Sequence, residues 1–277
     1  MLSHANISFN AHQFRTWYVD FRDGEESMLA IFPFFHAAGW TGLKNTGIYA
    51  GWANILVPRP EPDQIIDLLE KFKPSLLPGV ATIFVALLHS ERFRKMDLSF
   101  VKAYLTGSAP MAVETIKMLK ERRNVPLVNV YGLTEITPMG TATPWGGDEK
   151  PGTVGIPLPN TDLKIVDLET GTKEMPIGEV GEICFKGPQV MTGYYKNQEE
   201  TDKVLIDGWL YTGDIGFMDA EGYVTIVDRK KDIILASGFN IYPREIDELL
   251  MTHPKALEVC TIGIPDAYRG ETVKTFV

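Results

Sequence analysis

The first half of the chain alternates short apolar runs with segments whose apolar residues recur every three or four positions. A first helix, which Ser3 can cap, precedes this pattern. The apolar runs predict strands, and the segments between them predict helices. The strands are expected at 29–35, 54–58, 75–77, 101–105 and 125–131, and the helices at 42–51, 62–73, 80–88 and 111–122. Such alternation is typical of a doubly wound, mostly parallel α/β sheet, which binds ligands at its strand ends.

The composition of the chain changes beyond Pro138, where glycine and proline become frequent. Short strands are expected at 162–167, 181–186, 189–194 and 222–228, and a helical turn at 201–205. Past a polar segment, further strands at 233–235, 258–262 and 271–277 accompany a helix that Pro243 begins, with Ile246, Leu249 and Leu250 as its apolar stripe. We therefore divide the chain into an α/β part (1–139), a β-rich part (140–228), a hinge (229–232) and a small α+β part (233–277).

Composition narrows the function classes. The 277 residues carry a net charge of −9, with a pI of about 5.1, which argues against a nucleic-acid binder that relies on a basic surface. The two cysteines and five histidines show no metal-binding spacing, and the cysteines favour a reducing compartment, the cytoplasm. No signal peptide is recognisable, and the apolar stretch 76–88 is too short to span a bilayer. Peripheral membrane association and oligomeric state are left open.

Three predicted strand ends carry candidate chemistry. His36 follows the first strand, where it is either a site residue or, on the residues alone the favoured interpretation, a core or loop histidine. The small residues of Gly107-Ser108-Ala109-Pro110 would let the backbone approach a flat ring, or would simply make a tight turn. In Tyr131-Gly132-Leu133-Thr134-Glu135, the aromatic ring can stack on a purine, the hydroxyl can donate to a phosphate and the acid can hold magnesium.

The second half offers one further acid. Asp214 lies in an apparent glycine turn, Thr212-Gly213-Asp214. A carboxylate with two acceptor oxygens suits a vicinal diol, although an aspartate in a turn also commonly binds the turn's own amides. Lys230 and Lys231, taken alone, are a solvated charge pair.

These motifs together resemble one family. YGLTE at 131–135, GEICFKGPQVMTGYY at 181–195 and the stretch 207–250 are similar to the adenylate-forming (AMP-binding) superfamily of acyl-CoA synthetases, luciferases and peptide-synthetase adenylation domains, in particular to long-chain-fatty-acid–CoA ligases. The resemblance implies a distorted-barrel form for the β-rich part. It also implies that Tyr131 contacts adenine, Thr134 the α-phosphate, Glu135 Mg²⁺, and Asp214 and Arg229 the ribose of ATP or AMP, with 107–110 and Gly132 in the same nucleotide site.

The resemblance assigns four further residues. Lys231 would be the hinge about which the small part turns, and Gly238 would let CoA pass the backbone, unless it is a plain turn glycine. His36 would gate the passage between the carboxylate pocket and the CoA tunnel. Trp40 would line the acyl pocket, or else be a core aromatic.

The family's phosphate loop and its catalytic lysine have no counterpart in the sequence. We therefore expect a fragment of an ATP-dependent acid–thiol ligase, with residual nucleotide binding at best and negligible turnover. The parent reaction would form an acyl-adenylate and then a CoA thioester. A medium- or long-chain fatty acid is the first choice of substrate and an aryl or cinnamate-type acid the second. An inactive nucleotide-binding module, or a plain scaffold, is the alternative of another class.

Overall fold

The computed structural model describes residues 1–107, 111–253, 255–266 and 268–277. The chain divides into two compact units. The first unit comprises 1–162 and 185–210, and the second comprises 163–184 and 211–277. The boundaries at 184/185 and 210/211 fall inside strands β9 (Gly181–Lys186) and β11 (Trp209–Met218), so each of these strands contributes residues to both units. The four-part division expected from the sequence stays a prediction.

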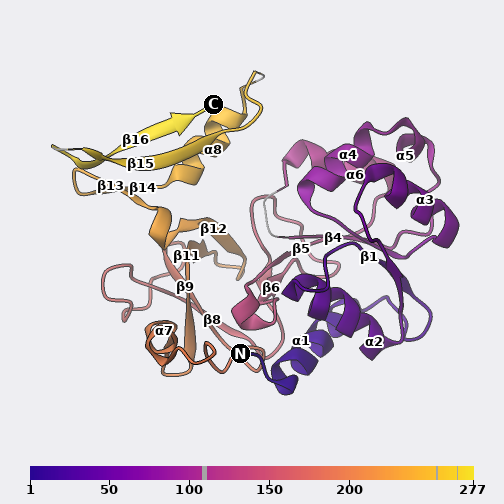
Figure 1. Ribbon diagram of the computed structural model, residues 1–277, viewed down its shortest axis with the longest axis horizontal. Coiled ribbons are helices and arrows are strands. Elements are labelled where there is room, and N and C mark those ends of the chain that lie inside the picture. The colour runs from indigo at the N-terminus through magenta and orange to yellow at the C-terminus, as the bar shows by residue number, and fades with distance from the viewer. Residues whose placement is uncertain (108–110, 254, 267) are drawn as a thin grey trace. The chain divides into compact units, whose positions relative to one another are not determined.

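The first unit is built on a seven-stranded sheet (Figure 1). Its order is β2 (Ala53–Leu56), β1 (Ser27–Ala30), β3 (Leu76–Pro78), β4 (Ala103–Gly107), β5 (Leu127–Tyr131), β6 (Thr141–Ala142), β7 (Ile156–Pro157). The first five strands are parallel and the last two antiparallel. This arrangement confirms the mostly parallel α/β sheet.

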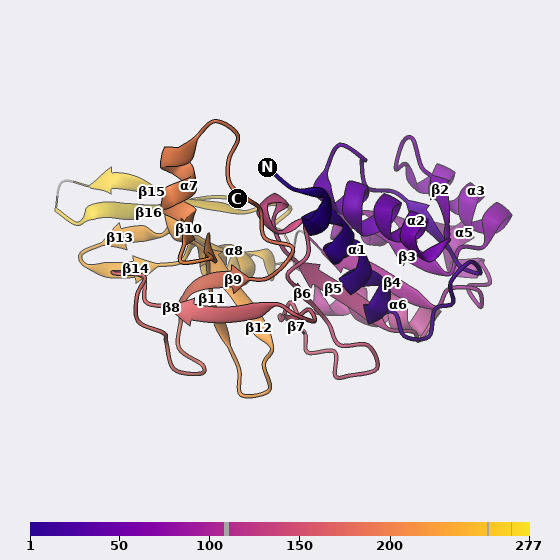
Figure 2. The same ribbon diagram turned by 90° about the horizontal axis from the view of Figure 1, so that it is seen from below.

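Helices cover both faces of this sheet, with α1 and α2 on one side and α3 to α6 on the other (Figures 1 and 2). They are α1 (His4–Trp17), α2 (Thr46–Ala50), α3 (Pro62–Phe72), α4 (Ala81–His89), α5 (Glu91–Lys95) and α6 (Val113–Arg122). Neighbouring strand residues divide between two buried clusters: Leu77 and Tyr104 pack with α3 and α4, whereas Leu76 and Ala103 pack with α1. Successive side chains of a strand point to opposite faces of the sheet, so these continuously apolar strands pack against the helices on both faces.

Local signals at helix ends are confirmed. Ser3 caps α1, its Oγ accepting from the Asn6 amide at 3.1 Å while the Asn6 side chain accepts from the Ser3 amide. Pro62 occupies the first turn of α3, where a missing N–H costs little. Gly51 ends α2 with a left-handed φ of 68°. Among the described residues no helix has both the length and the apolar character needed to cross a membrane.

Three sequence predictions about backbone structure are wrong. The strand expected at 29–35 ends at Ala30, before Pro33, which has no amide to donate to a sheet. The single helix expected at 42–51 is a π-helix, η1 (Ala38–Asn45), followed by α2. No strand forms at 189–194; there the Val190 amide donates to Gly187 and the Met191 amide to the Glu135 carbonyl, so the apolar alternation serves a loop instead.

Two more sheets complete the fold. The five-stranded one has the order β10 (Leu205–Ile206), β11, β9, β8 (Asp162–Val166), with β12 (Val224–Arg229) beside β11. The four-stranded one has the order β14 (Phe239–Ile241), β13 (Ile234–Ala236), β16 (Gly270–Phe276), β15 (Cys260–Asp266). Helix α8 (Pro243–Met251) packs against β15 of this sheet. The helical turn expected at 201–205 is α7 (Gln198–Val204). In α8 the expected apolar stripe is only partly covered: Ile246 and Leu250 are half-buried, but Leu249 is 70% exposed.

Candidate functional site

The loop after β5 carries the first group of predicted site residues. Tyr131 ends the strand, and a short 3₁₀ turn, η2 (Thr134–Ile136), follows. A Cβ at Gly132 would lie 1.7 Å from the Pro138 carbonyl oxygen, so only glycine fits there. The Tyr131 ring lies 6.0 Å from the ring of Phe185 and is half-buried, while Thr134 is exposed. The loop therefore holds its backbone tightly and leaves the threonine hydroxyl accessible.

Glu135 is held from two sides. Its Oε1 accepts a hydrogen bond from the Tyr194 hydroxyl at 2.9 Å, and its backbone carbonyl accepts from the Met191 amide at 2.7 Å. Burial, and then the bond to Glu135, raise the pKa of Tyr194 to about 12. The phenol therefore stays a donor, and it orients the carboxylate without using up its acceptor sites.

Glu135 can bind Mg²⁺ only together with ligands from other groups. No group of three or more His, Cys, Asp or Glu side chains that could hold a metal occurs in the part of the chain that the structure describes. Mg²⁺ is commonly bound through one or two carboxylates together with substrate phosphates and water. Glu135, half-buried and held by Tyr194, fits that role only if nucleotide oxygens and water complete the ion's coordination.

The neighbouring strand ends contribute less defined groups. Gly107 ends β4 beside Val130, where a Cβ would lie 2.8 Å from the Val130 carbonyl oxygen. The other three residues of that predicted loop, 108–110, lie outside the described residues. His36 follows β1 and is exposed, its Nδ1 accepting from the Ala38 amide at 3.1 Å, so it is not a core histidine. Trp40 is 44% exposed, with the Lys44 ammonium 2.9 Å from its ring centroid, so it is not a core aromatic.

Asp214 and Arg229 lie directly opposite each other on β11 and β12. Arg229 Nε is 3.4 Å from Asp214 Oδ1; the aspartate side chain is 8% exposed and the arginine side chain 60%. Asp214 is part of β11 and not of a turn, which corrects the sequence prediction. Gly213 keeps a φ of 73°, a conformation that favours glycine. The structure thus brings the two predicted ribose ligands together, although 15 positions separate them in the sequence.

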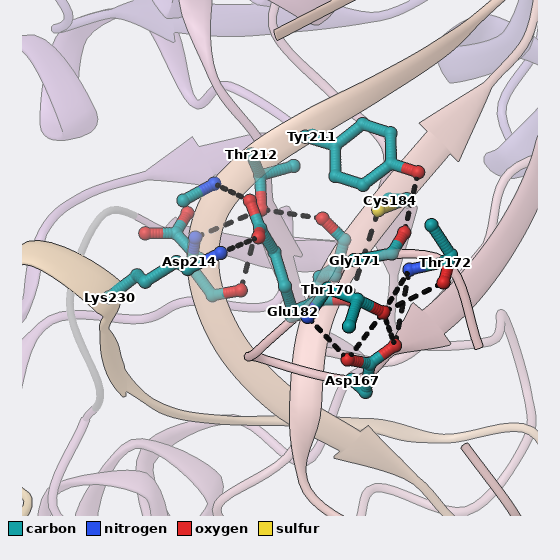
Figure 3. Close-up of polar contacts among 12 residues, drawn as sticks. Asp167, Thr170, Gly171, Thr172, Glu182, Cys184, Tyr211, Thr212, Asp214 and Lys230 are labelled. Carbon is teal, nitrogen blue, oxygen red and sulfur yellow. Dashed lines mark hydrogen bonds and ion pairs between the residues drawn. The ribbon is translucent and has the colours of Figure 1, made fainter. Parts of the chain in front are cut away.

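Residues of β9 bond to Thr212 and Gly213, which precede Asp214 on β11; Figure 3 shows Glu182, Thr212 and Asp214 close together. Thr212 Oγ1 donates to the Ile183 carbonyl at 2.8 Å and accepts from the Asp214 amide at 3.0 Å. Glu182, 4% exposed, accepts from the Gly213 amide at 3.0 Å and from Lys230 Nζ at 2.7 Å. No role for Glu182 was predicted from the sequence. An acid inside the otherwise apolar run Gly181–Phe185 is the signal that could have found it.

The residues of the predicted hinge and CoA passage lie further along the second unit. Lys231 is exposed in η3 (Lys230–Asp232). Gly238 lies in the tight connection between β13 and β14, with a φ of 82°. A backbone φ of this value favours glycine, so the turn alone explains why Gly238 is a glycine. Its place in a CoA passage stays a prediction.

Residues 1–195 match the family of AMP-binding enzymes. The chain belongs to this family. All of it aligns with a long-chain-fatty-acid–CoA ligase of Bacillus subtilis at 47% identity and with one of Escherichia coli at 38%, covering 49% of each relative. A probable 4-coumarate–CoA ligase of Dictyostelium discoideum is 37% identical, with 50% covered. The chain thus spans about half the length of the curated relatives it matches.

Solved structures of related enzymes confirm the fold of this chain. ATP-bound MatB from Rhodopseudomonas palustris superposes with a TM-score of 0.91 at 34% identity, covering 99% of this chain and 54% of that one. MenE, the O-succinylbenzoate coenzyme A synthetase of B. subtilis, in complex with ATP and magnesium gives 0.87 at 26% identity, covering 99% and 55%. The resemblance inferred from the motifs is therefore confirmed.

The predicted site residues fall into two groups. Tyr131, Thr134 and Glu135 belong to the first unit, and Asp214 and Arg229 to the second. Each group is assembled by its own unit. That the two groups share one nucleotide cleft stays a prediction.

Proposed function

We propose that the chain is the nucleotide-binding and acid-activating portion of an ATP-dependent, AMP-forming acyl-CoA synthetase. The observation that carries the proposal is the buried Asp214 paired with Arg229 across two strands. A buried carboxylate has two acceptor oxygens for the two ribose hydroxyls, and the exposed arginine beside it can donate to the same sugar. The family match and relatives named long-chain-fatty-acid–CoA ligases support the same conclusion.

In the proposed reaction a substrate carboxylate oxygen attacks the α-phosphorus of ATP. The bond to the β-phosphate oxygen breaks, and pyrophosphate leaves with that electron pair. Tyr131 would stack against adenine, Thr134 would donate to the α-phosphate, and Glu135 would hold Mg²⁺, which offsets the phosphate charge. Asp214 and Arg229 would fix the ribose. In the second step the CoA thiolate attacks the acyl carbonyl carbon and AMP leaves.

A fatty acid of medium or long chain is the substrate we propose. The exposed aromatic side chains of Phe35 and Trp40 lie in the segment that follows β1, which also carries His36, and they offer apolar surface for an acyl chain. His36 would gate this region. An aryl or cinnamate-type acid is the second candidate, because one relative is a probable 4-coumarate–CoA ligase. A panel of acids, assayed by pyrophosphate release with the full-length parent enzyme, decides between them.

Two unpaired cysteines, Cys184 and Cys260, fit the reducing cytoplasm in which we place the protein. For the 277-residue chain itself we propose nucleotide binding without appreciable turnover. Robust thioester formation by this chain alone would contradict that statement.

Calorimetry with AMP tests the nucleotide site directly. Asp214→Asn keeps the shape of the side chain but removes its charge, and the charge-assisted bonds at stake are worth about 1.5–3 kcal/mol. We therefore expect AMP binding to weaken roughly 10- to 150-fold. Asp207→Asn, at an exposed acid just before β11, is the matched control and should leave the affinity unchanged. Absence of AMP binding to the unmodified chain, or equal affinities for both variants, would overturn the proposal.

A further inference from the structure

Glu182 is a buried acid to which the proposed reaction assigns no contact with substrate. It lies on β9, between Gly181 and Ile183, with its side chain 6% exposed. An ionised carboxylate at this depth is costly unless it is paired and hydrogen-bonded. Both requirements are met by groups from distant parts of the chain, since Gly213 lies 31 positions and Lys230 48 positions away.

The two partners of Glu182 sit immediately beside the proposed ribose ligands. Gly213 precedes Asp214 on β11, and Lys230 follows Arg229 at the end of β12. The two acids of strands β9 and β11 thus receive one cation each from the consecutive pair Arg229-Lys230, at 3.4 Å and 2.7 Å. Figure 3 shows the Lys230 side chain directed toward the Glu182 carboxylate, with Asp214 nearby.

The two carboxylate oxygens of Glu182 have different partners. One carboxylate oxygen of Glu182 receives the Gly213 amide, and the other receives the ammonium of Lys230. If Lys230 withdraws, the buried charge keeps only an amide partner, and it gains by turning toward water and releasing Gly213. The position of Lys230 is therefore linked to the conformation of the peptide that carries Asp214.

We propose that Glu182 is a positioning residue for the ribose site: it fixes the Gly213–Asp214 peptide, and it does so only while Lys230 is bound to it. The assignment deepens the proposed function and rests on it. Lys230 starts the η3 turn, the predicted hinge. Its side chain is 42% exposed, so the ammonium group can leave Glu182 for water. The affinity of the site for a nucleoside monophosphate is thereby tied to the residue at which the hinge begins.

Two readouts test the assignment on the 277-residue chain. The first is hydrogen exchange at the Gly213 amide, and the second is the dissociation constant for AMP from calorimetry. Lys230→Met leaves the buried acid with half of its partners, and we expect roughly tenfold faster exchange and roughly tenfold weaker AMP binding. Lys230→Arg restores the charge-assisted pair and should bring both values back toward those of the unmodified chain.

The Glu182→Gln, Lys230→Met double variant separates positioning from general stability. The neutral amide keeps a carbonyl oxygen for the Gly213 amide and no longer needs a cation, so the double variant should exchange more slowly at Gly213 than Lys230→Met alone. Lys173→Met, at an exposed lysine in the same unit, removes the same charge and should change neither readout.

The possible outcomes separate the two claims. Faster Gly213 exchange in Lys230→Met, with no AMP binding even to the unmodified chain, supports the link between Lys230 and Gly213 and refutes the proposed nucleotide site. AMP binding that Lys230→Met leaves unchanged, with Gly213 exchange also unchanged, refutes the role of Glu182 and leaves the nucleotide site standing. A double variant that exchanges as fast as Lys230→Met also refutes the assignment.

Discussion

The start of helix α8 depends on an acid from a different element, Asp228 at the end of β12. Asp228 is 9% exposed; its Oδ1 accepts from the Arg229 amide at 2.7 Å and its Oδ2 from the Arg244 amide at 3.0 Å. The Arg244 amide is one of the first-turn donors that a helix cannot satisfy internally. The Arg244 side chain donates as well, to the Ile226 carbonyl at 3.1 Å. β12 and α8 are thus joined across the η3 turn by two hydrogen bonds, both donated by Arg244.

Asp228→Ala should loosen this connection measurably. The change removes two hydrogen bonds to a charged acceptor, each worth about 1.5–3 kcal/mol. Only the Arg244 bond belongs to the helix start; because its amide is partly buried, water offsets part of the loss, and the net cost to the first turn of α8 is about 2 kcal/mol. The first turn of α8 should therefore open roughly 30-fold more often. Hydrogen exchange of the amides of 244–247 in the native protein measures this opening directly.

Glu245→Gln is the matched control, since Glu245 is an exposed acid in the same first turn. It removes only a charge–dipole interaction of about 0.3–1 kcal/mol. Asp228→Asn should fall between the two, because its amide oxygen can accept from only one of the two donors at full strength. Equal exchange rates in Asp228→Ala and Glu245→Gln would refute the reasoning, and would mean that Asp228 contributes no more to the helix start than an exposed charge in its first turn.

Three further predictions each concern a single side chain. Asn10→Ala leaves the buried amide and carbonyl of Met139 without their partner, so the free energy of unfolding in urea should fall by about 2–4 kcal/mol; an unchanged midpoint would contradict this. Burial raises the pKa of Cys184 to about 12, so a thiol reagent at pH 8 should modify only the exposed Cys260 until denaturant is added. The pKa of Tyr194 is raised to about 12 from 10.0, so its stabilising contribution is complete below pH 10 and is lost as the pH rises through 12; Tyr194→Phe should remove one late step from a phenolate absorbance titration.

Features with local causes were predictable from the sequence. The Ser3 cap, the Pro62 helix start and the Gly51 helix stop each depend on a few adjacent residues, and all three are present. The parallel sheet followed from strand–helix alternation, because parallel neighbours need crossovers of this length. Of the site residues, Asp214 and Arg229 were singled out from motifs, and the strand register that places them opposite each other is a long-range result.

Features that depend on distant partners were missed. Residues 189–194 have the alternation of a strand, yet their amides are used elsewhere: that of Met191 donates to the Glu135 carbonyl and that of Thr192 to the Met1 carbonyl. This loop also carries Tyr194 to Glu135. A pattern of apolar residues specifies which side chains are buried but not which backbone acceptor each amide finds, so the second support of Glu135 was not visible in the sequence.

Glu182 shows why buried acids are the informative exceptions. On an apolar strand a lone acid is ordinarily assigned to the solvent face, where it needs no partner. Here it is buried, and an acid this deep requires partners that the strand itself cannot supply. Both are supplied by segments that carry a proposed ribose ligand, and a packing role alone would be served as well by an apolar side chain. The charge is therefore best explained by what it holds in place.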